Sequence, residues 1–302
     1  MRCLGSFELT LKMAHEGTLS SVWFLTLALV YFSGAPCIDF SDAGCGRGTD
    51  GATGQLFLDD VALALLLGLA IIIKEIVPGI LRPHLRPVLD AAIEMLQADG
   101  RYVAGFRLLR CRRHGDPHTT RERVFVVAVL RSRLRPGVGS SDFFPSEIEG
   151  PVGGRVADIL DHDGTSPRPH DSVDLDIRRV EWLAPRSSTE GYDGLHLVGR
   201  YDASSEIGHH VYEISGPCPT LRTGGTGPGL GTGLFVDRPR GSHIFRLSPR
   251  ECLRVQSFDG DIYFQARKLG ISDEAIYRLT GNTIPVMTLR SLISHLLSLL
   301  QW

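Results

Sequence analysis

The sequence of 302 residues predicts an α/β protein with a doubly wound, mostly parallel sheet and a smaller, loop-rich domain. Strand-like and helix-like patterns alternate over residues 1–135, as in a sheet covered by helices. Residues 136–243 are instead rich in glycine, proline and serine, with short strand-like runs at Leu195–Val198 and Val211–Ile214. Regular patterns return over residues 244–302, so we expect the first domain to be built from both ends of the chain.

The first elements follow from apolar runs. Leu27–Phe32 predicts a buried strand; a secretory signal over Val22–Phe32 is the alternative, and this run is too short to span a bilayer. Leu56–Leu67 is rich in leucine and alanine and predicts a helix. Ala70–Ile73 is a short run containing β-branched residues and predicts a buried strand.

Three more elements follow before residue 135. Leu85–Ala98 has apolar residues at helical spacing and is closed by Gly100, which predicts an amphipathic helix. Tyr102–Leu109 and Val124–Leu130 predict two further strands. Strands and helices in this order indicate an α/β sheet.

The C-terminal part begins with a clear helix start. Ser248 is a suitable N-cap, Pro249 suits the first helical position, and Glu251 completes a capping box. Ile284–Leu300 has apolar residues at helical spacing and predicts a last helix that packs on the first domain. The glycine-rich tract Gly224–Gly233 lacks the spacing of a phosphate-binding loop, so we expect a flexible recognition loop or simply a disordered loop there.

The formal net charge is only −2, but its make-up is uneven. Of the 32 basic residues, only Lys12, Lys74 and Lys268 are lysines, and ten arginines lie between Arg101 and Arg135. Guanidinium groups bind phosphates and guanine edges, so the excess is compatible with a nucleic-acid partner. A biased genome composition explains the overall arginine count equally well.

The six cysteines are spread along the chain without a CxxC pair. This pattern indicates reduced thiols, an intracellular setting and no structural zinc. The HGDPH segment at His114–His118 has metal-binding residue types but no evident third ligand, so we expect a solvated loop.

Four short motifs occur in order along the chain. They are PC at Pro36–Cys37, followed by Phe40, Ser41, Ala43 and Gly44; EIVPG at Glu75–Gly79; RERVF at Arg121–Phe125; and LSPREC at Leu247–Cys252, followed by Gly281, Asn282, Ile284 and Pro285. Together they resemble the motifs of the cytosine-C5 DNA methyltransferases, from about Tyr31 to the C-terminus. Residues 136–243 then correspond to the target recognition domain, and the resemblance implies the sheet of S-adenosylmethionine-dependent methyltransferases, N-terminally incomplete.

The resemblance implies a chemistry for these motifs. Cys37 would supply a thiolate that adds to C6 of cytosine, since C5 takes a methyl group readily only after such an addition. Glu75 would hydrogen-bond or protonate N3 during the attack. Arg123, supported by Arg121, would hold the O2 side of the base or organise the closed loop. The ordinary alternative for the two arginines is a surface strand with alternating charges.

The resemblance also implies a cofactor and a partner. S-adenosyl-L-methionine would contact Pro36 and Asn282. The substrate would be double-stranded DNA, from which the target cytosine is flipped into the pocket, with RNA as the alternative. The predicted nucleic-acid contacts are Ser41, Thr220, Arg222, Arg238 and Arg240. We expect a monomer that lies with the DNA inside the cell, is neither secreted nor membrane-bound, and holds no metal.

The sequence departs from the family pattern in two ways. Ile38 and Ile76 replace a glutamine and an asparagine of the family, and Thr119 replaces another glutamine. Only 36 residues precede Cys37, and none of them forms the glycine-rich FxGxG motif of the family's cofactor site. We therefore expect weak or no binding of S-adenosylmethionine, and keep two alternatives to an active enzyme: a truncated or inactive DNA-binding relative, and an unrelated secreted α/β domain.

Overall fold

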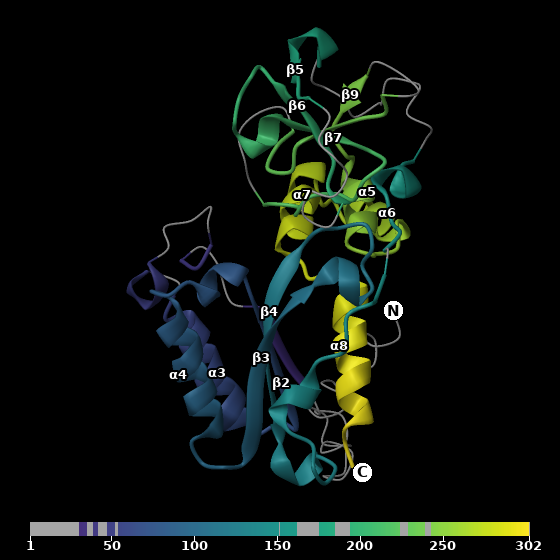
Figure 1. Ribbon diagram of the computed structural model, residues 1–302. Helices are drawn as coiled ribbons and strands as arrows, with labels where there is room; N and C mark the ends of the chain where they lie inside the picture. Colours follow the sequence, from purple (N-terminus) through teal and green to yellow (C-terminus); the bar gives the residue numbers. More distant parts are fainter. Residues whose placement is uncertain are drawn as a thin grey trace. The chain divides into compact units, whose positions relative to one another are not determined.

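The computed structural model describes residues 30–34, 39–41, 47–51, 54–150, 152–161, 175–184, 194–223, 229–238 and 243–301 (Figure 1). The chain divides into two compact units. Unit 1 comprises Met1–Arg107, Val124–Phe143 and Leu299–Trp302, and unit 2 comprises Leu108–Arg123 and Phe144–Ser298. The domain boundaries expected from the sequence stay a prediction.

The first sheet has the strand order β1 (Val30–Gly34), β2 (Ile71–Ile76), β4 (Glu122–Leu130) and β3 (Tyr102–Arg110). β1 and β2 are parallel, whereas β2 and β4 are antiparallel. The α/β class is confirmed, but the described sheet is mixed, so the expectation of a mostly parallel sheet was wrong for these strands. The segment between β3 and β4 is too short for a crossover helix, so β4 returns in the opposite direction.

β1 lies at one end of the described sheet. Its residues are at most half-buried, and Phe32 is 37% exposed. The buried strand predicted at Leu27–Phe32 is therefore displaced toward the C-terminus and less buried than expected, and residues 27–29 lie outside the described part. β2 is buried at all six positions, which suits a strand that has neighbours on both edges.

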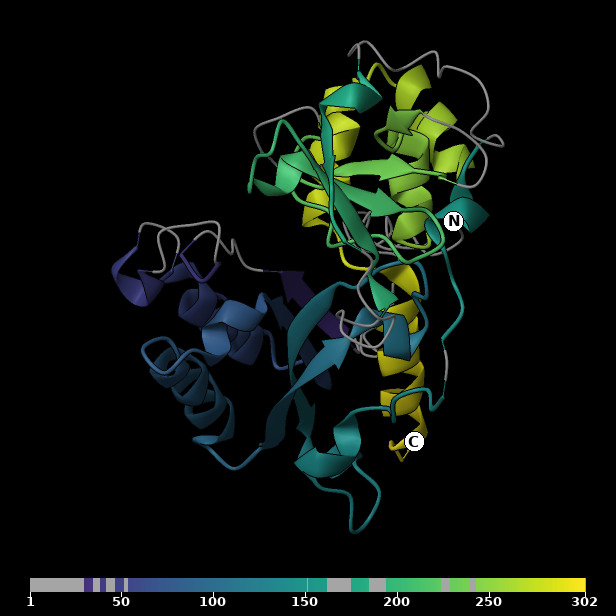
Figure 2. The same cartoon turned by 45° about the horizontal axis from the view of Figure 1, so that its top comes forward.

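Two helices of unit 1 lie together on one side of this sheet (Figures 1 and 2). α3 (Leu56–Leu67) has the predicted bounds, and Gly68 ends it in the left-handed region at φ 62°. α4 (Arg86–Gln97) confirms the predicted amphipathic helix. It buries the apolar stripe Val88, Leu89, Ala92 and Leu96.

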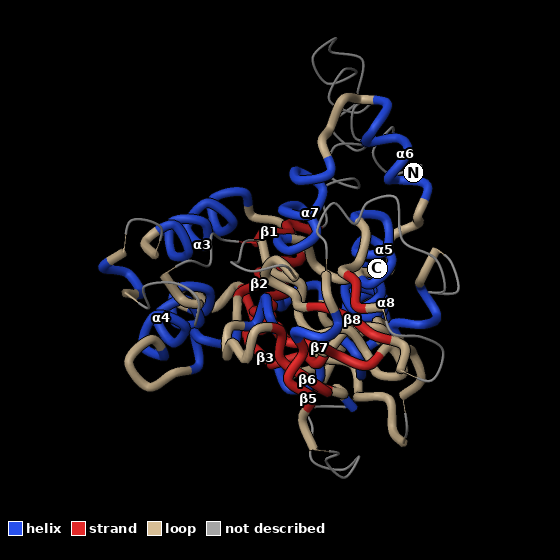
Figure 3. The backbone as a smooth tube through the Cα atoms, turned by 90° about the horizontal axis from the view of Figure 1, so that it is seen from above, coloured by secondary structure: helices blue, strands red, loops and turns tan. Residues whose placement is uncertain are grey.

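The second sheet belongs to unit 2 and has the strand order β5 (Val180–Trp182), β6 (Leu197–Tyr201), β7 (His210–Glu213), β8 (Leu234–Val236) and β9 (Ile244–Phe245). β7 and β8 are parallel, and the other neighbouring pairs are antiparallel. Strands β5 to β8 follow one another in Figure 3. Each of the two short runs predicted from the sequence overlaps a strand. The rings of Tyr212, Phe235 and Phe245, one each from β7, β8 and β9, pack against one another in a core cluster.

Four helices follow: α5 (Pro249–Val255), α6 (Asp261–Lys268), α7 (Asp273–Asn282) and α8 (Val286–Ser298). The capping box that predicted the start of α5 is confirmed, with Ser248 Oγ accepting from the N–H of Glu251 at 3.2 Å. The last predicted helix is confirmed as α8. Within the part of the chain that the structure describes, no helix is both long and apolar enough to cross a bilayer.

A buried carboxylate caps α8. Asp116 is fully buried and accepts hydrogen bonds from the backbone N–H of Met287 at 3.3 Å and of Thr288 at 2.5 Å. The first turn of a helix has free N–H groups that need such acceptors. Burial raises the pKa of Asp116, against the effect of hydrogen bonds from Ser257 and Thr288. The expectation of a solvated HGDPH loop was therefore wrong, and His114 is buried as well.

Candidate active site

Glu75 lies near the carboxyl end of β2, opposite the end of β1. Gly34, the last residue of β1, is its partner in the parallel ladder. Glu75 is only 8% exposed, and a Cβ built on Gly34 would lie 3.4 Å from Glu75 Oε2. The carboxylate therefore faces the point where the chain leaves β1. Parallel strands end at the same edge of a sheet, which is where α/β proteins place their sites.

The next described residues after Gly34 are Asp39–Ser41, which pack against the turn after β2 at Gly79. A Cβ built on Gly79 would lie 1.9 Å from the carbonyl oxygen of Phe40, so only glycine allows this approach. Phe40 is fully buried, and its ring meets that of Phe57 edge to face at 6.0 Å between centroids. Gly48 donates its N–H to the carbonyl of Asp39 at 3.0 Å. Both flanks of residues 35–38 are thus anchored in unit 1, while Pro36 and Cys37 lie outside the described residues.

The two arginines of the third motif have different surroundings in unit 2. Arg121 is almost fully buried and donates to the carbonyls of Leu221 at 3.1 Å and Gly281 at 3.0 Å. Its guanidinium thus ties the segment before Arg222 to the end of α7. Arg123 is also buried and donates to the carbonyl of Glu122 at 2.7 Å.

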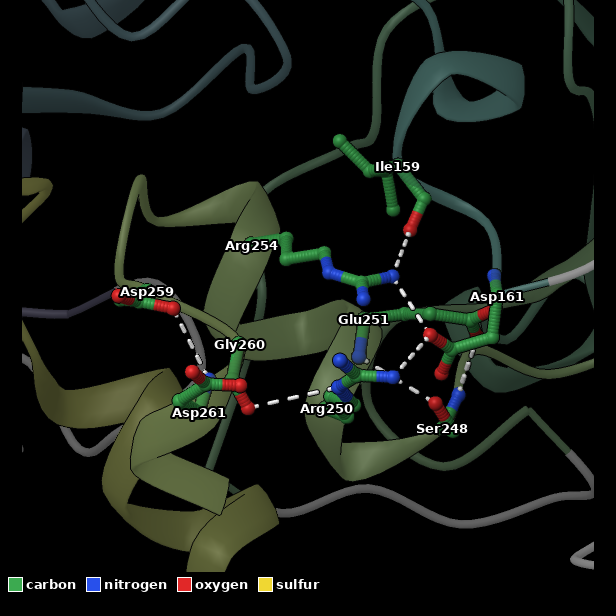
Figure 4. A network of polar contacts seen from close by, with 9 residues as sticks. All are labelled: Ile159, Asp161, Ser248, Arg250, Glu251, Arg254, Asp259, Gly260 and Asp261. Carbon is green, nitrogen blue, oxygen red and sulfur yellow. Dashed lines mark hydrogen bonds and ion pairs between the residues drawn. The ribbon is translucent and has the colours of Figure 1, made fainter. Parts of the chain in front are cut away.

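The fourth motif anchors a distant segment to α5 (Figure 4). Asp161 accepts from Arg250 at 2.8 Å and from Arg254 at 2.7 Å. The capping carboxylate of Glu251 accepts from the backbone N–H of Asp161 at 2.9 Å and of Ser248 at 2.7 Å. The motif therefore stabilises the segment Ile159–Asp161 within the loop-rich region. Sequence reasoning missed Asp161, because nothing in its local sequence indicates a partner 90 residues away.

The residues predicted to contact nucleic acid have unequal surroundings. Arg222 is exposed and lines a cavity of about 430 Å³ in unit 2, whereas Thr220 is half-buried. Arg238 donates from Nε to the buried Glu213 at 2.6 Å, so its charge is already compensated. Ser41 is half-buried next to the Phe40 carbonyl that contacts Gly79. Arg240 lies outside the described residues.

Comparison with known proteins identifies the family. The model for C-5 cytosine-specific DNA methylases matches residues 29–298. The chain belongs to this family. The resemblance drawn from the four motifs is therefore confirmed.

Several curated relatives are methyltransferases. The type II methyltransferase M.MthTI of Methanothermobacter thermautotrophicus is 25% identical over 266 residues, which cover 85% of this chain and 74% of the relative. The type II methyltransferase M.SsoII of Shigella sonnei is 23% identical over 279 residues, or 90% of this chain and 64% of the relative. The orphan methyltransferase M.SPRI of Bacillus phage SPR is 43% identical over 54 residues. The chain spans only 12% of the length of M.SPRI, so the activity of a whole relative is not established for it.

Solved structures agree with the fold. The Entamoeba histolytica methyltransferase EhMeth matches with a TM-score of 0.58 and 14% identity, over 93% of this chain and 80% of that chain. The Dnmt2 methyltransferase of S. pombe matches with a TM-score of 0.55 and 17% identity, over 93% of this chain and 81% of that chain. At these identities the likeness shows the fold alone.

The family uses S-adenosyl-L-methionine, and the described residues provide only part of a site for it. Asn282 is exposed at the end of α7 and lines a cavity of about 280 Å³. The other lining residues are Leu253, Phe258, Leu279, Thr280 and Thr283. None of them is charged, whereas the cofactor has a carboxylate, an ammonium and a sulfonium group that need partners. The described residues around Asn282 therefore do not fit the whole cofactor.

Proposed function

We propose that this chain is a DNA (cytosine-5-)-methyltransferase that works through a covalent adduct between Cys37 and the target base. Family membership supports the class of reaction. The observation that carries the proposal is the arrangement at the end of β1. The carboxylate of Glu75 faces Gly34, and Gly79 supports Phe40. Both flanks of residues 35–38, here called the Cys37 segment, are therefore held close to β2.

Chain length limits how far Cys37 can be from this carboxylate. An extended residue spans at most about 3.6 Å, so the three steps from Gly34 to Cys37 reach roughly 11 Å. The return to Asp39 takes only two steps, and Asp39 is tied to Gly48. Only four residues, 35–38, therefore connect Gly34 to Asp39. This supports a single pocket for the sulfur and the carboxyl group.

The first chemical step follows from these two groups. The Cys37 thiolate forms a bond to C6 of cytosine, and the electron pair of the C5–C6 double bond moves into the ring toward N3. Glu75 donates a proton or a hydrogen bond at N3, so negative charge does not build up on the base. The resulting enamine carries its nucleophilic electron pair at C5. The methyl donor of the family is S-adenosyl-L-methionine, which we propose as the cofactor of the whole enzyme.

The remaining residues would deliver the base. A cytosine within duplex DNA has to be extruded, which costs a few kcal/mol. We propose that Ser41, Thr220 and Arg222 offset this cost through contacts to the DNA, with the exposed Arg222 as the main contact. Arg123 would hold the O2 side of the base. Arg121 would support Arg123 through the two segments that its guanidinium ties together.

A second candidate is a DNA-binding relative without catalytic activity. Ile76 is fully buried, where the family pattern has a polar asparagine. A buried isoleucine has no group to hydrogen-bond the loop around Cys37. The incomplete cofactor site near Asn282 favours the same alternative.

Duplex DNA that contains 5-fluorocytosine distinguishes the two candidates, because fluorine at C5 blocks the elimination that releases the enzyme. With S-adenosylmethionine present, we expect an adduct that survives denaturation and is lost in Cys37→Ser. Cys45→Ser serves as the matched control and keeps the adduct. Binding of the duplex without any adduct would overturn the proposed activity and support the inactive relative.

A further inference from the structure

A polar cluster of half-buried residues surrounds the buried Lys74 on the face of β1 and β2 that Glu75 does not use. It consists of Tyr31 and Ser33 on β1, Asp60 on α3 and Lys74 on β2. Lys74 is fully buried and forms an ion pair with Asp60. Its Nζ also donates a hydrogen bond to Ser33 Oγ at 3.1 Å. Asp60 also accepts hydrogen bonds from Tyr31 Oη and Ser33 Oγ. One carboxylate thus binds side chains from both strands.

Stability alone is a poor explanation for this cluster. Burial lowers the pKa of Lys74 to about 7, which reflects the cost of holding its charge away from water. The Asp60 carboxylate and the ring of Phe57, 5.1 Å from Nζ, offset part of that cost. Apolar residues of similar volume often serve a protein core as well as a buried ion pair does. Apolar residues, however, do not fix the relative position of two strands as hydrogen bonds do, because only hydrogen bonds require a defined direction between donor and acceptor.

The directions of these bonds match the strand register. Ser33 and Lys74 are partners in the parallel ladder, and Tyr31 precedes Ser33 by two residues on the same face of β1. A slip of one residue would turn Tyr31 and Ser33 to the opposite face. A slip of two residues would separate Ser33 from Lys74. In either case Asp60 would lose its partners on β1.

The next pair in the same ladder is Gly34 with Glu75. The register fixed by the cluster is therefore the register that sets the end of β1 opposite the proposed acid. A shift by one ladder step would move the start of the Cys37 segment by about 3.3 Å along the sheet edge. Displacements of even 1 Å at a reacting centre reduce rates on the order of 10²-fold.

We propose that Asp60 and Lys74, with Tyr31 and Ser33, fix the register of β1 against β2 and thereby position the Cys37 segment against Glu75. We call these four residues the register pin. The inference rests on the proposed function for its catalytic consequence, but its structural content concerns only β1, β2 and α3. None of the four residues touches the base, so they are positioning residues for thiolate addition.

The most direct test removes the two donors of β1 and leaves the ion pair intact. The variant is Tyr31→Phe with Ser33→Ala, which changes little volume and preserves Asp60 and Lys74. The control is Arg86→Met with Asp90→Leu, which removes an exposed ion pair of 2.8 Å on α4 of the same unit. Three quantities are measured: amide hydrogen exchange in β1, the rate of adduct formation with 5-fluorocytosine DNA, and DNA affinity.

We expect the β1 amides of the Tyr31→Phe, Ser33→Ala protein to exchange at least tenfold faster than in the wild type. We expect the adduct to form on the order of 10²-fold more slowly, with DNA affinity unchanged. The control variant keeps wild-type values for all three quantities. Wild-type exchange in β1 together with a wild-type adduct rate would overturn the inference.

A second variant separates positioning from packing. Asp60→Leu with Lys74→Met replaces the ion pair by apolar side chains, and we expect a wild-type urea midpoint together with fast β1 exchange and slow adduct formation. Recovery of slow exchange and fast adduct formation in this variant would show that the cluster only fills space. If the wild type itself forms no adduct, the proposed function fails, and hydrogen exchange in β1 still decides whether the pin exists.

Discussion

The turn after β2 provides a sharp test of how the Cys37 segment is supported. In Gly79→Ala, the new Cβ would lie 1.9 Å from the carbonyl oxygen of Phe40, whereas ordinary contact begins near 3.4 Å. One backbone segment must therefore move by roughly 1.5 Å. Phe40 has little freedom to move, because it is fully buried and packs edge to face on Phe57.

Two magnitudes follow from this overlap. Forced overpacking in a core costs about 1–3 kcal/mol, so the free energy of unfolding of Gly79→Ala falls by that amount. Movement of Phe40 also displaces the end of the Cys37 segment. We therefore expect the rate of adduct formation with 5-fluorocytosine DNA to fall on the order of 10²-fold.

Urea unfolding and the rate of adduct formation measure both effects. Gly139→Ala is a matched control in the same unit, because the nearest atom to its new Cβ is 3.9 Å away. This control should keep the wild-type midpoint and rate. A Gly79→Ala protein that behaves like the control would refute the view that this turn supports the Cys37 segment.

Three further predictions concern unit 2. Arg121→Met removes donors to the carbonyls of Leu221 and Gly281, so the free energy of unfolding should fall by about 3 kcal/mol; an unchanged urea midpoint would contradict this. Burial raises the pKa of Asp116 above its ordinary value of 3.8. At pH values between the ordinary pKa and the raised pKa of the folded chain, the folded chain therefore binds more protons than the unfolded chain. The wild type should therefore gain stability relative to Asp116→Asn as pH falls through that window, and a loss would contradict the assignment. Burial also raises the pKa of Cys111 to about 12, so iodoacetamide at about pH 8 should modify this thiol only after unfolding, as peptide mass spectrometry would detect.

Local features of the sequence predicted local structure well. The bounds of α3 follow from an apolar run that ends at Gly68, whose left-handed backbone closes the helix. The start of α5 follows from a capping box whose bonds lie within four residues, Ser248 to Glu251. Motif order predicted the family, because four motifs in the family's order rarely occur together by chance.

Contacts between residues far apart in the sequence could not be predicted from local patterns. The direction of β4 depends on the connection from β3 and not on the residues within the strand. Asp116 was expected in a solvated loop because its partner Thr288 is 172 residues away. The ion pair between Asp60 and Lys74 joins a helix to a strand, and no local pattern in the sequence indicates it. Arg121 was expected to support Arg123, and its contacts to Leu221 and Gly281 became visible only in the folded chain.

The central claim is that the Cys37 sulfur and the Glu75 carboxyl group share one pocket. Treatment of Glu75→Cys with a short bifunctional maleimide tests it without any substrate, because the reagent can join two thiols across one pocket, whereas a direct disulfide would require Cα atoms within about 7 Å. Ile76→Cys is the control, since the next side chain on β2 points to the other face of the sheet. The account predicts a cross-link between the peptides containing Cys37 and position 75, and none for the control. A Glu75→Cys protein in which Cys37 stays freely alkylated, or in which the new thiol pairs with another cysteine, would contradict it.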